Sequence, residues 1–171
     1  MSGSYELGRI LHISAEAIGQ PGQRRFRLRA IAPDGQSASL WLEKEQVNAL
    51  ADAIDSVLTD QGYEYRMRPL DDLEPEPVFP LNPSIDMHLA QLSMGVNRDT
   101  NAVVLIATDG SEPGEADSTT VTLEFDFRQA FEFRRQAKDV VAAGRPPCPL
   151  CTGPMDPEGH VCVRSNGHNP H

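Results

Sequence analysis

The first half of the chain shows the hydrophobic pattern of a β-meander. Polar and apolar residues alternate from position 25 to position 30, so Arg25, Arg27 and Arg29 share one face of a half-buried strand and the apolar residues share the other. Glycine- and proline-containing turns flank this strand, and a second strand is expected over 37–42. Weaker patterns predict a strand or two within 6–18.

The second half repeats this order. Its strands are expected over 86–95, 102–108 and 119–125. Apolar residues at helical spacing predict one helix from about Glu45 to Thr59 and another from about Phe127 to Ala142. A shift of 83 residues superposes the two strand-to-helix units, and for example places Gln46 on Gln129. Any two strand-to-helix units would align in a similar way, because the matches are mostly of apolar class.

The predicted fold is therefore α+β. Two tandem antiparallel β-meander-plus-helix units pack as a pseudo-duplicate, followed by a small zinc-stapled C-terminal tail. The expected divisions are residues 1–61 for the first unit, 62–84 for an acidic, proline-rich linker, 85–144 for the second unit and 145–171 for the tail.

Charge and apolar content narrow the classes of partner. The chain carries 25 acidic and 15 basic residues, a net charge of -10, which argues against nucleic acid and anionic membranes as partners. The row of Arg25, Arg27 and Arg29 is expected to be a solvated face balanced by acidic neighbours.

No apolar run reaches the roughly 20 residues that span a bilayer. Residues 1–11 lack the pattern of a signal peptide, so we expect a cytoplasmic protein.

The tail carries a metal-ligand pattern. Its candidate ligands are Cys148, Cys151, His160 and Cys162, in the arrangement C-x2-C-x8-H-x-C. Two thiolates two residues apart chelate one ion from a tight turn, and the glycines and prolines that follow let the chain turn back. Three thiolates and one imidazole form a closed tetrahedral zinc site, so we expect one structural zinc per chain.

Two alternatives concern this tail. His168 or His171 would replace His160 as the nitrogen ligand. Cys148 and Cys151 would instead form a redox pair, although such a pair is expected at a helix N-terminus after a strand, and here it follows two prolines.

Several blocks of sequence resemble one known family. Residues 143–151 read AGRPPCPLC and residues 155–162 read MDPEGHVC, with further similarity in GQPG at 19–22 and LEKEQV at 42–47. Together they resemble an actinobacterial family described as domain of unknown function 3090. The recurring ligand-type positions of that family correspond to Cys148, Cys151, His160 and Cys162, and His168 falls where the family often has tyrosine. The helix start at 126–128 departs from the family pattern.

The resemblance implies a partner but no activity. The family has no settled reaction, and ParJ, which resembles it, is linked to the chromosome-segregation ATPase ParA. A ParA-type ATPase is therefore the partner that the resemblance implies.

Two functions follow as hypotheses. The first is a non-enzymatic, zinc-containing regulatory or adaptor protein that acts through protein–protein contacts. The alternative is an enzyme of unknown reaction with a site between the two halves. A flat face with exposed apolar residues would favour the adaptor, and a deep pocket of convergent ionisable groups would favour the enzyme.

Overall fold

The computed structural model describes residues 3–20, 22–72, 75–110, 116–143, 149–151 and 162. The strands are β1 (Gly3–Arg9), β2 (His12–Ile18), β3 (Arg25–Ile31), β4 (Ser37–Leu42), β5 (Ile85–His88), β6 (Gln91–Asn97), β7 (Ala102–Thr108) and β8 (Thr119–Asp126). The helices are α1 (Lys44–Asp60), the short 3-10 helix η1 (Leu70–Asp72) and α2 (Phe127–Ala142). Both predicted α-helices are confirmed, and α2 has the predicted bounds.

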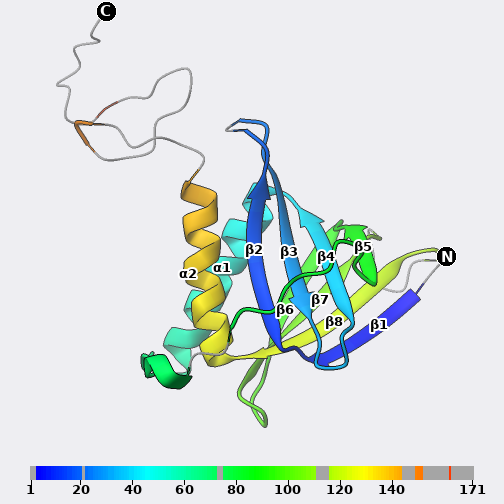
Figure 1. The fold of residues 1–171 in the computed structure, drawn as a ribbon, viewed down its shortest axis with the longest axis horizontal. Helices are drawn as coiled ribbons and strands as arrows, with labels where there is room; N and C mark the ends of the chain where they lie inside the picture. Colours follow the sequence, from blue (N-terminus) through cyan, green and yellow to red (C-terminus); the bar gives the residue numbers. More distant parts are fainter. Residues whose placement is uncertain are drawn as a thin grey trace, which may run out of the picture.

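The strands form two four-stranded sheets, in the orders β1-β8-β7-β6 and β2-β3-β4-β5. Each sheet contains one antiparallel meander, as the sequence predicts. The fourth strand of each sheet comes from the other half of the chain. β1 pairs in parallel with β8, and β5 pairs in parallel with β4 (Figure 1). The architecture is α+β and compatible with two units that exchange their first strands.

Each exchange takes place between two adjacent residues. The Ile10 N–H donates to Glu124 O at 2.9 Å, whereas the Leu11 N–H donates to Ile31 O in the other sheet at 2.7 Å. In the second half, the Leu89 N–H donates to Trp41 O at 2.8 Å and the Ala90 N–H to Thr108 O at 2.9 Å. The prediction of one strand over 86–95 is therefore wrong. The chain changes sheets there, and an alternating pattern does not show which sheet a strand joins.

One hydrophobic core joins both sheets and both helices. The inner residues of the central strands are fully buried, and so is Phe133 on α2. The ring of Phe133 packs on that of Phe125 in β8, with centroids 6.1 Å apart. Since both meanders and both helices contribute to the same core, neither half has a separate interior.

The two helices begin in the same way. The Glu43 N–H donates to Gln46 Oε1 at 2.8 Å, and the Asp126 N–H donates to Gln129 Oε1 at 3.0 Å. In α2 the Asp126 side chain returns the bond, because Oδ1 accepts from the Gln129 N–H at 2.8 Å. Such a capping box provides acceptors for backbone N–H groups that the first turn leaves unpaired. The matching glutamines lie at the predicted offset.

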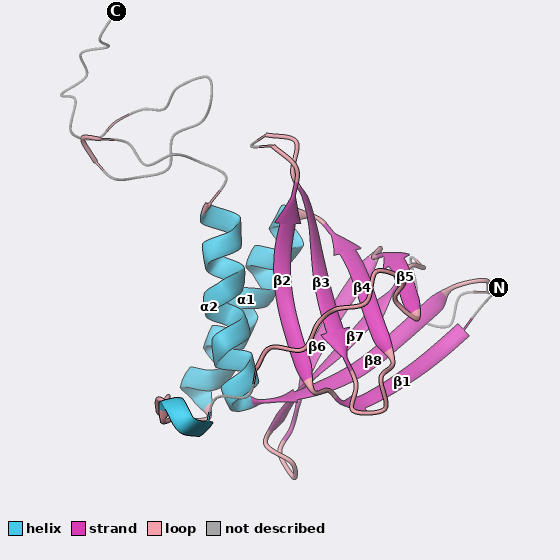
Figure 2. Ribbon diagram, in the orientation of Figure 1, coloured by secondary structure: helices cyan, strands magenta, loops and turns pink. Residues whose placement is uncertain are grey.

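The helices lie side by side and run antiparallel, next to the edge strand β2 (Figures 1 and 2). Arg134 of α2 forms an ion pair with Asp55 of α1 at 3.2 Å, and Lys138 forms another with Asp52. In the described part of the chain, neither helix is long and apolar enough to cross a membrane.

Residues 75–84, here called the crossing segment, run over the outer face of the β2-β3-β4-β5 sheet (Figure 2). Ser84 fixes one end, since its N–H donates to Ser37 Oγ at 3.1 Å and its Oγ accepts from the Ser37 N–H at 3.2 Å. Phe79 packs over Arg29, with 5.2 Å between the guanidinium carbon and the ring centroid. The predicted linker thus includes a segment held on a sheet face.

The strand exchange predicts that neither half folds alone. A fragment of residues 1–72 would lack β5 beside β4, and its own β1 would lack β8, leaving Leu7 and Ile10 without a core. We expect this fragment and the fragment 73–171 to be largely unfolded separately and to regain native far-UV circular dichroism when mixed. Independent cooperative melting of either fragment would contradict the exchange.

Candidate functional site

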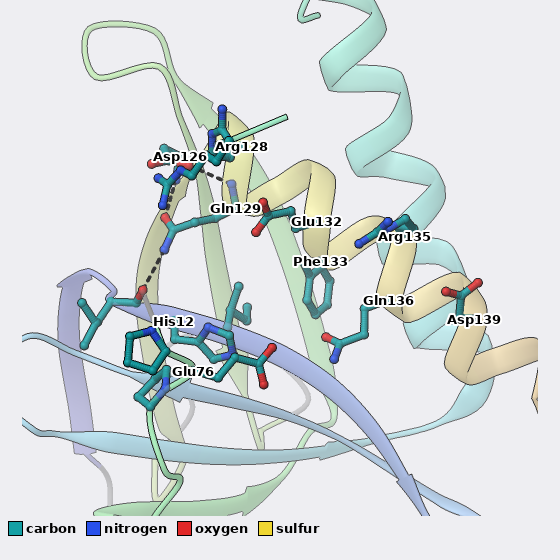
Figure 3. A pocket seen from close by; sticks show the side chains of 15 residues that line it. His12, Glu76, Asp126, Arg128, Gln129, Glu132, Phe133, Arg135, Gln136 and Asp139 are labelled. Atoms are coloured by element: carbon teal, nitrogen blue, oxygen red, sulfur yellow. Dashed lines mark hydrogen bonds between the residues drawn. The ribbon is translucent and has the colours of Figure 1, made fainter. Parts of the chain in front are cut away.

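A groove in the described part of the chain lies between α2 and β2. It has a volume of about 650 Å³ and is open to solvent on one side. Figure 3 shows α2 side chains on one wall, with His12 of β2 and Glu76 of the crossing segment opposite. The lining residues are Leu11, His12, Ile13, Arg68, Pro75, Glu76, Pro77, Asp126, Arg128, Gln129, Glu132, Phe133, Arg135, Gln136 and Asp139.

Two glutamines of α2 hold the helix against β2. Gln136 Oε1 accepts from the Ala15 N–H at 2.9 Å, and Gln129 Nε2 donates to the carbonyl oxygens of Ile10 and Leu11 at 3.2 and 3.1 Å. An edge strand exposes backbone groups that otherwise pair with other chains. The Gln136 amide bonds one of these groups in β2, and the Gln129 amide bonds the two residues that precede the strand.

The groove carries charges of both signs. Glu76, Glu132 and Asp139 are exposed carboxylates, and Arg68 and Arg135 are exposed cations. Arg128 is more constrained, because its Nη2 donates to Arg66 O at 2.6 Å and its guanidinium lies 5.7 Å from the ring centroid of Tyr65. Such a lining is better suited to binding a polar surface that carries charges of both signs than to binding an apolar small molecule.

A shallower hollow of about 360 Å³ lies beside the end of α1, against Tyr63 and Phe127. Burial raises the pKa of Tyr63, and the nearby Arg128 opposes the shift. The tyrosine is therefore neutral at physiological pH and contributes an aromatic surface here.

The predicted metal ligands fall only partly within the described residues. Cys151 and Cys162 are described and both are half-buried, whereas Cys148 and His160 lie outside the described residues. In the described part of the chain, no three His, Cys, Asp or Glu residues are grouped so as to hold a metal. Because half of the predicted set is missing from that search, the zinc site stays a prediction.

The arginine row lies on the outer face of its sheet. Glu16 of β2 pairs with Arg27 and, at 3.3 Å, with Arg29. Arg25 instead lies over the ring of Trp41, with 4.2 Å between the guanidinium carbon and the ring centroid. An acidic neighbour therefore balances part of the row, as expected. The sequence did not reveal the cover by Phe79, because a single aromatic residue in a proline-rich stretch carries no periodic signal.

These features define an α+β protein built from two strand-exchanged meander-plus-helix units, with a charged groove where α2 meets β2. The chain belongs to the family described as protein of unknown function (DUF3090), whose model matches residues 5–162. No curated protein and no solved structure matches the chain.

The contact between Gln136 and the edge of β2 is testable. Replacing Gln136 by alanine leaves the partly buried Ala15 N–H without its acceptor, which should lower the free energy of unfolding by about 1–3 kcal/mol. Urea denaturation would measure the change. Gln36→Ala, at an exposed turn position, is the matched control and should be nearly neutral. Equal effects of the two changes would show that the glutamine does not hold α2 to the edge strand.

Proposed function

We propose that this protein is a non-enzymatic, cytoplasmic, zinc-containing regulatory adaptor that acts by binding another protein. The observation that carries the proposal is the exposure of large apolar side chains between α1 and β5. Met67, Val78 and Leu81 are 83%, 92% and 99% exposed. Val78 and Leu81 lie three residues apart on the crossing segment, and exposed apolar side chains that are near one another are typical of a protein interaction surface.

The crossing segment presents two of these side chains from a fixed backbone. Phe79 packs against the sheet between Val78 and Leu81, and the Ser37–Ser84 bonds hold the end of the segment. Prolines at 75, 77, 80 and 83 restrict the backbone further. A partner that covers Val78 and Leu81 would therefore lose little binding energy to ordering this segment.

A structural zinc in the tail fits this proposal. Three thiolates and an imidazole from Cys148, Cys151, Cys162 and His160 would fill all four positions around zinc. No position would remain for a water molecule or a substrate, so the ion would stabilise the tail. This chemistry supports a tail that contributes to binding, with a ParA-type ATPase as the partner to test first.

Capture of a partner should depend on the crossing segment. Burying either side chain contributes roughly 1.5–3 kcal/mol, so the double variant Val78→Ser/Leu81→Ser should weaken capture by about tenfold or more. Quantitative affinity pull-down from the native host would measure this, with a purified ParA-type ATPase as a second assay. Ile106→Ser, on β7 and 41% exposed, is the matched control and should retain capture. Unchanged capture by the double variant would reject this surface.

The zinc site predicts about one zinc per chain, resistant to dialysis, in protein purified without chelator. Cys148→Ser and His160→Ala should both lose the metal, while His168→Ala should keep it. Circular dichroism of the strands and helices should change little, because the core residues that the structure describes come from the two sheets and the two helices. Elemental analysis decides the outcome. A chain without metal and with three titratable thiols would favour the redox pair, and loss of zinc in His168→Ala would reassign the nitrogen ligand.

The groove between α2 and β2 supports the alternative of an enzyme, because it lies between the two halves and carries His12 beside ionisable groups of both signs. A thermal-shift screen of metabolites would separate the two functions. A compound that stabilises the native protein but not the Arg135→Ala variant would favour an enzyme.

A further inference from the structure

The outer face of the β2-β3-β4-β5 sheet has polar rows that run across the strands. The strand register places Arg29 between Ser14 and Ser39 and places Asp86 next to Ser39. The neighbouring row contains Glu16, Arg27, Trp41 and His88. Ser14 and Ser39 are 4% and 1% exposed, although they face away from the hydrophobic core.

Two buried polar atoms in the first row have no hydrogen-bond partner among the residues that the structure describes. They are Nε of Arg29 and Oγ of Ser39, on directly paired residues of β3 and β4. Burying a polar group without a partner is unfavourable, so such groups usually have a ligand or a water. An arginine N–H only donates and a serine O–H can donate, so a hydrogen-bond acceptor would satisfy both.

The Nε–H of Arg29 is the guanidinium donor that lacks a partner among the described residues. The Nη1 of the same guanidinium is 3.3 Å from Glu16 Oε2, on the side away from Nε. The edge formed by Nε and Nη2 is one that binds a carboxylate through two parallel hydrogen bonds. With the hydroxyl of Ser39, this edge offers three donors to one planar group.

Charge decides between possible acceptors. Arg25, Arg27 and Arg29 lie on this face with two carboxylates, those of Glu16 and Asp86, which leaves one positive charge in excess. Asp86, next to Ser39, accepts from Trp41 Nε1 at 2.7 Å. A ligand with one negative charge balances this excess. A doubly charged phosphate would add a second negative charge close to Glu16 and Asp86.

The crossing segment shields this position. The Phe79 ring lies over Arg29 at 5.2 Å and over Arg27 at 5.9 Å, measured from guanidinium carbon to ring centroid. The ring covers guanidinium faces and leaves the edges for hydrogen bonds. Excluding water in this way strengthens a charge-assisted hydrogen bond.

We infer that Arg29 and Ser39 form a binding site for a single carboxylate group on the outer face of this sheet. The site takes a small carboxylic acid or the Asp or Glu side chain of a bound protein segment. The acetate test does not depend on Val78, Leu81 or the tail, whereas a protein segment as the source of the carboxylate rests on the proposed adaptor function.

Sodium acetate is the probe for this site. Titration of ¹⁵N-labelled full-length protein, at constant ionic strength maintained with sodium chloride, should give a saturable downfield shift of the Arg29 Nε–H proton. Ser39→Ala should weaken the apparent affinity by about fivefold, the loss expected for one hydrogen bond. Ser14→Ala removes the serine on the other side of Arg29 and should leave the affinity unchanged.

Three outcomes would overturn the assignment. Absence of a saturable shift would mean that water alone fills the site. The same response to chloride would mean ionic screening. Saturation by inorganic phosphate at lower concentration than by acetate would reject a carboxylate. If the wild type responds as expected, partner capture by the Ser39→Ala variant shows whether a small acid or a protein segment supplies the carboxylate. Capture falls only when a protein segment supplies it.

Discussion

The parallel pairing of β1 with β8 and of β4 with β5 is the constraint on which the rest of the structure depends. In each pairing, the first strand of one half of the chain becomes an edge strand of the sheet that the other half forms. The chain switches sheets within two residues at 10–11 and again at 89–90. The two halves of the chain are therefore tied together by backbone hydrogen bonds as well as by side-chain packing, and the single core follows from this arrangement.

Parallel neighbours also require a long connection, because the chain must return to the end from which the first strand started. Between β4 and β5 this connection is α1 followed by residues 61–84. The last part of the connection crosses the outer face of the sheet that β5 joins (Figure 2). Phe79, Val78 and Leu81 are thus displayed on that face as a consequence of the strand exchange. The proposed partner surface and the carboxylate site both depend on this crossing.

The two halves differ where the candidate groove forms. α2 lies along β2 and bonds its backbone through Gln129 and Gln136. At the shift of 83 residues, Gln46 matches Gln129, whereas the position of Gln136 corresponds to Ala53 in α1. Therefore α2 has a glutamine at both positions, whereas α1 has a glutamine at the first position only. The charged groove is found on the side where both are present.

Sequence periodicity predicted the helices, the two meanders, the outward arginine row and the matching helix starts, because these depend on residues close together in the chain. It failed over residues 86–95, because alternation reports a buried face and not a partner strand. The groove, the packing of Phe79 on the arginines and the pairing of Arg29 with Ser39 each bring together residues that are about ten or more positions apart in the chain. No local pattern encodes such contacts. By itself the sequence determined the local elements and a metal-ligand pattern in the tail. Only the tertiary structure decided which strands exchange and which polar groups meet on a sheet face, since both depend on hydrogen bonding and packing between distant segments.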